Sequence, residues 1–173
     1  LQESTKSSPY QTQVDVVMRA VDTHGRRLVA LIEVKLSESG FSGCSAFDAA
    51  TNPTRHVCHQ DGPWGGEPAE CFQLANKGGP QRRTYDLFVT PDAVASTGHG
   101  CEFRELNQPL RNVALGRALI ERGEAAEVVF ALCAPVDNRA AWRQWSRVSD
   151  AYASVPGIDV RSLPADQVAT ALG

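Results

Sequence analysis

Two residues of opposite charge that could take part in catalysis stand close together early in this 173-residue chain. Glu33 and Lys35 lie in the segment Leu28–Leu36, whose other seven residues are all apolar. Side chains two residues apart on a strand leave the same face, so a carboxylate and an ammonium would point the same way. An apolar strand covered on both faces does not hold two such charges without cause. Function is the cause that we favour.

A second carboxylate, Asp15, lies on the preceding segment, Gln13–Val21, which alternates as a strand does. The turn-rich residues Asp22–Arg27 would join the two strands into a hairpin. One register places Asp15 on the face of Glu33 and Lys35, a slip of one residue places it on the other, and the sequence leaves both open. On a shared face, the two carboxylates suit Mg²⁺ or Mn²⁺, with water and a phosphate as further ligands. Lys35 would orient the attacking water or stabilise negative charge on the phosphate.

The rest of the chain predicts the elements that would hold these residues in place. A helix should begin at Gln108, with Pro109 in its first turn, and end near Arg122. The order of the predicted elements, β-β-β-α-β-α-β-α, indicates an α/β domain with a mixed sheet flanked by helices. The other predicted elements are strands at Thr84–Val89, Glu127–Cys133 and Ile158–Ser162 and helices at Asn138–Tyr152 and from Pro164.

Asp15 followed by Glu33-Val34-Lys35 on an apolar strand resembles the core of the PD-(D/E)XK nuclease superfamily, over roughly residues 13 to 133. Val14 stands where the superfamily name has Pro, a position known to vary. The resemblance implies a restriction-endonuclease-like fold and Mg²⁺-dependent cleavage of DNA. Asp15 and Glu33 would bind the metal, and Lys35 would act on the attacking water. Relatives often pair to cut two strands, so a homodimer is an expectation as well.

The helix from Gln108 carries further candidates. Its start, Gln108-Pro109-Leu110-Arg111-Asn112, together with the spacing of the cysteines, is similar to an uncharacterised bacterial branch of restriction endonucleases. That branch would direct Gln108, Arg111 and Asn112 toward the active face, where they would grip phosphate. Alternatively, Asn107 or Gln108 only caps the helix and Arg111 lies on the surface.

Residues 37–83 form a loop-rich insertion with little hydrophobic periodicity. Cys44, Cys58 and Cys71 lie within it and Cys101 follows it, and four such thiolates could hold a structural Zn²⁺ or an iron–sulfur cluster. No Cys-x-x-Cys pair is present, and the alternative is that these cysteines are buried thiols. Trp142 and Trp145 could likewise stack on bases, but core packing is the role that their helical spacing favours.

Length and composition limit the number of domains and the classes of partner that the chain could have. Residues 1–173 suit a single domain, in which residues 1–12 would be a tail or the end of a lost helix. A net charge of −3 argues against nucleic-acid binding by bulk electrostatics alone. No signal pattern or spanning apolar run is present, and five cysteines are an odd number, so we expect a cytoplasmic protein with reduced thiols and no membrane partner.

Two other functions stay open at this point. One is a catalytically inactive nucleic-acid-binding or protein-interaction module of the same fold. The other is a metal-binding domain unrelated to nucleases, with the hairpin charges exposed. Register and burial of Asp15, Glu33 and Lys35 discriminate between these and an enzyme.

Overall fold

The computed structural model describes residues 14–53, 55–59, 101, 103–153 and 155–172. Contacts divide the chain into two compact units. The first comprises Leu1–Thr12 and Ser42–Ala114, and the second Gln13–Phe41 and Leu115–Gly173. The predicted tail at 1–12, the predicted strand at Thr84–Val89 and Cys71 lie outside the described residues.

The second unit begins with the predicted hairpin, formed by β1 (Val16–Val21) and β2 (Arg27–Val34). Asp22 organises its turn: Oδ1 accepts hydrogen bonds of 2.8 Å from the backbone N–H groups of His24 and Arg26. Gly25 takes φ +78°, which a residue without a β-carbon adopts at little cost. The turn chemistry of the sequence therefore closes the hairpin at the place where it was predicted.

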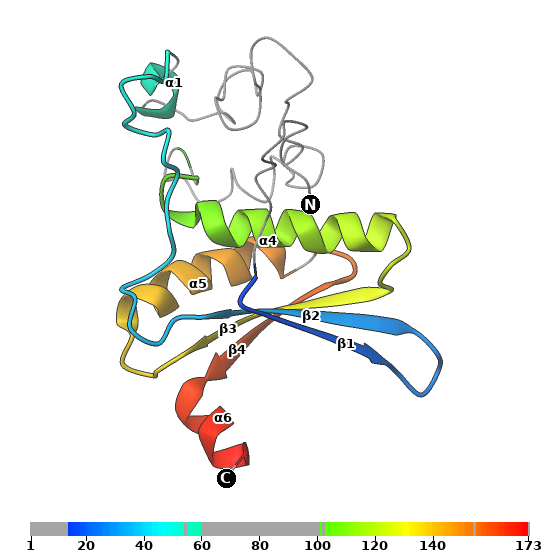
Figure 1. Ribbon diagram of the computed structural model, residues 1–173. Coiled ribbons are helices and arrows are strands. Elements are labelled where there is room, and N and C mark those ends of the chain that lie inside the picture. Colours follow the sequence, from blue (N-terminus) through cyan, green and yellow to red (C-terminus); the bar gives the residue numbers. More distant parts are fainter. Residues whose placement is uncertain (1–13, 54, 60–100, 102, 154, 173) are drawn as a thin grey trace. The chain divides into compact units, whose positions relative to one another are not determined.

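A four-stranded mixed sheet, in the order β1-β2-β3-β4, is the centre of this unit (Figure 1). Strands β3 (Glu127–Ala134) and β4 (Ile158–Pro164) run parallel to β2, whereas β1 is antiparallel to it. Along β2 every second side chain is buried, beginning at Val29. We call the face that carries these side chains the helix face. The predicted α/β class with a mixed sheet is confirmed.

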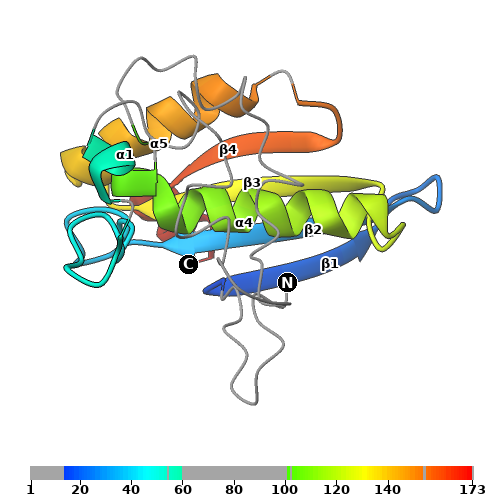
Figure 2. The same ribbon diagram turned by 90° about the horizontal axis from the view of Figure 1, so that it is seen from above.

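Two helical segments lie side by side over the helix face (Figure 2). One is the C-terminal part of α4 (Phe103–Glu121), where a β-carbon at Gly116 would lie 3.0 Å from Val128 Cγ1. The other is α5 (Arg139–Tyr152), whose Trp145 ring lies 4.9 Å from that of Phe130. Trp145 is 2% exposed, so it packs in the core.

The C-terminal end of α4 carries a cap. After α4, the N–H of Glu124 donates to the carbonyl of Leu119 and that of Gly123 to Ile120, with Gly123 at φ +66°. This is the hydrogen-bond pattern of a Schellman motif, and it ends the helix where the sequence predicts.

On the other side of the sheet, α6 (Ala165–Leu172) follows β4 directly (Figure 1).

The first unit contains α1 (Arg55–His59) and the N-terminal part of α4. The helix begins at Phe103, earlier than predicted, but Leu106 is non-helical (φ −114°, ψ 23°). A second helical segment starts after this kink, which puts Pro109 in a first turn, where its missing N–H costs no hydrogen bond.

Within the described residues, no helix is both long and apolar enough to cross a membrane.

Candidate functional site

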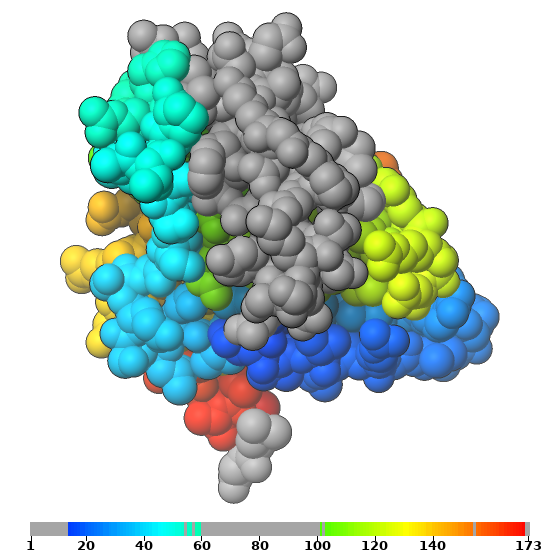
Figure 3. All heavy atoms as spheres, turned by 45° about the horizontal axis from the view of Figure 1, so that its top comes forward, coloured from blue at the N-terminus to red at the C-terminus, as the bar shows by residue number. Residues whose placement is uncertain are grey.

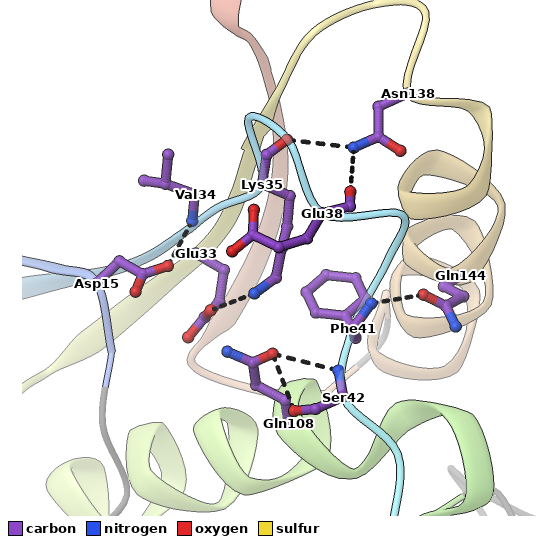
Figure 4. A network of polar contacts seen from close by, with 10 residues as sticks. All are labelled: Asp15, Glu33, Val34, Lys35, Glu38, Phe41, Ser42, Gln108, Asn138 and Gln144. Atoms are coloured by element: carbon purple, nitrogen blue, oxygen red, sulfur yellow. Dashed lines mark hydrogen bonds and ion pairs between the residues drawn. The ribbon is translucent and has the colours of Figure 1, made fainter.

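The pairing of β1 with β2 settles the register that the sequence left open. Val16 lies opposite Ile32 and Val17 opposite Leu31, so the same register continued by one residue places Asp15 opposite Glu33. Directly opposed residues of antiparallel strands share a face. Asp15 therefore belongs to the helix face, with Glu33 and Lys35. Figure 4 shows the Asp15 side chain directed toward β2, and Glu33 and Lys35 leaving β2 on one side.

Glu33 and Lys35 form a buried ion pair. Glu33 is 0% exposed and Lys35 6%, and Nζ of the lysine lies 3.8 Å from Oε2 of the glutamate. Removing either charge from water costs several kcal/mol, and the attraction between the two offsets part of that cost. The open, solvated hairpin that would favour an unrelated metal-binding domain is thus not observed for these two residues.

Asp15 is exposed and holds the end of the hairpin. Its Oδ2 accepts a hydrogen bond of 2.8 Å from the backbone N–H of Val34. Regular pairing of β1 starts only at Val16, so the carboxylate supplies the acceptor that a longer β1 would have offered. One carboxylate oxygen is engaged in this way, and Oδ1 is the second oxygen available to a ligand.

The main chain of Lys35 is fixed from two sides beyond the end of β2. Its N–H donates to the carbonyl of Cys133 (2.8 Å), and its carbonyl accepts from Nδ2 of Asn138 (3.2 Å). The same Nδ2 donates to the carbonyl of Glu38 at 2.8 Å, while Oδ1 of Asn138 accepts from Ala141 N and caps α5. One side chain thus joins the start of α5 to the segment that carries the lysine (Figure 4).

A second tether holds the same segment six residues further on. The N–H of Phe41 donates to Oε1 of Gln144 (2.8 Å), and its ring stacks on Trp145 at 6.1 Å. Nζ of Lys35 lies 5.7 Å from the centre of the Phe41 ring, close enough for a cation–π attraction. The ammonium is therefore held between an aromatic face and the Glu33 carboxylate.

Asn138 and Phe41 are the supporting residues that sequence reasoning missed. An Asn at the start of a predicted helix is an N-cap signal, but nothing in it reveals the hydrogen bonds to Lys35 and Glu38. Phe41 stands among glycines and serines, without the periodicity that would mark a buried position.

The donor set suits a small hard cation. Asp15 and Glu33 offer carboxylate oxygens on one face, and Mg²⁺ commonly takes one or two carboxylates together with water and substrate phosphate. Within the described residues, no three His, Cys, Asp or Glu side chains gather as a metal cluster. A two-carboxylate magnesium site does not require such a cluster.

The three candidates on α4 belong to the first unit. Gln108 bonds to Ser42: its Oε1 accepts from the Ser42 hydroxyl (3.3 Å), and its N–H donates to the Ser42 carbonyl (3.3 Å). Asn112 is 1% exposed, and Arg111 is partly buried. A phosphate-gripping role for these three residues stays a prediction.

Three of the four candidate metal-binding cysteines are described, and Cys71 is not. Cys58 is buried, and burial raises the pKa of its thiol, against a weaker opposing hydrogen bond from Asn52 Nδ2. Cys101 is also buried, and Cys44 is partly exposed. These three do not form a ligand cluster with other described residues, and the expected zinc or iron–sulfur site stays a prediction.

Comparisons with models of known families, with curated proteins and with solved structures find no match to this chain.

Proposed function

We propose that this chain is a metal-dependent phosphodiester hydrolase, a DNA nuclease of the PD-(D/E)XK type that cuts as an endonuclease. The observation that supports this most is the register that places Asp15 opposite Glu33, with Lys35 on the same face. The buried Glu33–Lys35 pair adds to it, because a structural role alone would not require two charges in the core.

In this proposal Asp15 and Glu33 hold Mg²⁺, which can be replaced by Mn²⁺. When bound, the ion would supply Lewis-acid stabilisation of the phosphate and would lower the pKa of a water molecule. Lys35 holds a positive charge beside the reacting phosphate and orients the attacking water with an N–H. Because it is nearly buried, its charge acts in a medium of low dielectric, where electrostatic stabilisation of a developing anion is strongest.

The supports of Lys35 have a defined part in this mechanism. Electrostatic catalysis requires that the charged group is in place before the reaction, so that no reorganisation is needed. Asn138 and Cys133 fix the main chain of the lysine, and the Phe41 ring limits the positions of its ammonium. The proposed active site therefore includes α5 as well as the hairpin.

The test is cleavage of supercoiled plasmid and of labelled single-stranded DNA with Mg²⁺ or Mn²⁺. Glu33→Gln and Lys35→Ala should abolish cutting, whereas Glu38→Gln should cut as the wild type does. Glu38→Gln is the matched control, because it makes the same carboxylate-to-amide change on an exposed side chain three residues beyond Lys35. Circular dichroism confirms that each variant folds.

Each outcome has a clear meaning. Metal-dependent cutting that only the two site variants lose supports the proposal. Cutting by Glu33→Gln at the wild-type rate contradicts it, since the metal would then lack its buried ligand. Binding of DNA without cutting by the wild type would favour an inactive binding module of the same fold.

A further inference from the structure

A cavity of about 260 Å³ lies at the far end of the hairpin from Asp15. Its lining includes two arginines, one from each strand, and one acidic residue from the turn after α4. The full set is Arg19, Ala20, Val21, Arg27, Leu28, Val29 and Glu124. In Figure 3 the turn after α4 (yellow-green) lies next to the blue atoms of β1.

The register places both arginines on the helix face, the face of the proposed catalytic residues. Arg19 lies opposite Val29, and Arg27 lies opposite Val21. Val29 is two residues from Leu31 and four from Glu33, so it shares their face, and its partner Arg19 does too. Arg19 and Arg27 are diagonal neighbours, which side chains of this length can bridge.

The two guanidinium groups differ in how they are held. Arg27 donates from Nη2 to the carbonyl of Gly123, so its position is fixed by the C-terminal cap of α4. In the described part of the chain, Arg19 makes no ion pair or side-chain hydrogen bond, and its charge is available to a ligand. Glu124 is the one acid of the lining, so the pocket carries a net positive charge.

The rest of the pocket is aliphatic. Its remaining lining residues are alanine, valine and leucine, and the exposed Val17 lies on β1 between Arg19 and Asp15. A fixed arginine, a free arginine and an apolar wall suit a ligand with an anionic group on a less polar frame. A phosphate on its sugar has this combination, and arginine is well suited to phosphate.

The pocket and the proposed catalytic site lie along the same strand, and their separation can be worked out from it. Arg19 is four residues from Asp15 on the same strand, or about 13 Å at about 3.3 Å per residue. A strand with its scissile phosphate at Asp15 and Glu33 would therefore bring another phosphate to the arginines.

We propose that Arg19 and Arg27 form a subsite for the nucleic-acid backbone, occupied by a phosphate about 13 Å along β1 from the bond that is cut. This inference rests on the proposed function, whose substrate it extends along the hairpin. Contacts of this kind position the strand and carry no sequence information.

The experiment measures binding with Ca²⁺ in place of Mg²⁺, so that cutting does not interfere. The probe is a fluorescein-labelled 20-nucleotide DNA, single-stranded or duplex, titrated at several salt concentrations. Arg19→Gln should weaken binding about three- to tenfold and reduce the slope of log Kd against log salt by about 1. Arg27→Lys keeps the charge but not the planar donor group, and should weaken binding less.

Arg161→Gln is the matched control. Arg161 lies opposite Ala131, which pairs with Ile32, so the arginine belongs to the other face of the sheet. Its substitution removes the same charge from an exposed position, and should leave the salt slope unchanged.

The outcomes separate this inference from the proposed function. If the wild type binds DNA but does not cut with Mg²⁺, and Arg19→Gln alone reduces the slope, the subsite is correct and the hydrolase is not. If the wild type cuts and Arg19→Gln behaves as Arg161→Gln does, the subsite is wrong and the hydrolase stands. Failure of the wild type to bind either form of DNA overturns the subsite.

Discussion

The buried pair of Glu33 and Lys35 allows a prediction that does not depend on catalysis. Replacing Lys35 by Met keeps the length of the side chain and removes its charge, which leaves the Glu33 carboxylate buried without that cation. At 3.8 Å and an effective dielectric constant near 20, the attraction between the two charges is about 4 kcal/mol. We therefore expect Lys35→Met to lower the free energy of unfolding by about 3 kcal/mol.

A double-mutant cycle also includes the variant that removes the Glu33 charge together with that of Lys35. In Glu33→Gln/Lys35→Met neither member of the pair is ionised, and exchanging a buried pair for neutral residues of similar volume is often close to neutral. We expect the free energy of unfolding of the double variant to lie within about 1 kcal/mol of the wild-type value. The double variant should therefore be more stable than Lys35→Met alone. Because Glu33→Gln alone should not stabilise the protein, the two substitutions should be coupled by at least about 2 kcal/mol.

Urea denaturation at pH 7, followed by tryptophan fluorescence, measures these free energies, because Trp145 is buried in the same unit. Glu38→Gln is the control for a carboxylate-to-amide change on the surface. Effects that add within about 0.5 kcal/mol would refute the reasoning, because independent substitutions behave in that way. The pair would then not be the reason why the core tolerates these charges.

Three further predictions concern the supports of the site and the rest of the fold. Asn138→Asp keeps the cap of α5 but cannot donate to the carbonyls of Lys35 and Glu38, so urea denaturation should show a loss of about 1–2 kcal/mol. Gly123→Ala places a β-carbon at φ +66° and should lower the stability by about 1 kcal/mol in the same assay. Burial raises the pKa of Cys58 in the folded protein, so the unfolded chain loses the thiol proton at a lower pH. In the same assay, the free energy of unfolding should therefore fall as the pH rises above about 8.5, and this fall should be smaller in Cys58→Ala.

Local signals in the sequence explain why most described elements could be predicted. The strands at Arg27–Val34 and Glu127–Ala134 are apolar runs of strand length, and Asn138 and Gly123 are cap residues at the ends of helices. The start of α4 was missed because the break at Leu106 separates two helical segments, and only the second has Pro109 as a signal. The predicted third strand lies outside the described residues.

The candidate site was predictable in its residue types and not in its geometry. Spacing alone places Glu33 and Lys35 on one face, but the position of Asp15 depends on the register, and that depends on how many residues the turn takes. Asp22 sets this number, because its carboxylate accepts from His24 and Arg26 and so closes the turn around Gly25. The sequence alone does not reveal these hydrogen bonds.

The direction of the strands explains why the site lies where it does. Lys35 follows the C-terminal end of β2 and Asn138 follows that of the parallel β3, while Asp15 precedes the antiparallel β1. All three therefore lie at one edge of the sheet, the edge where open α/β sheets bind their ligands. The alternation of β2, continued one residue past its end, places Val29 and Leu31 in the core and then Glu33 and Lys35, which bring charge to that edge. A single stripe of one strand thus supplies both the packing that fixes the hairpin and the charges that the proposed chemistry needs.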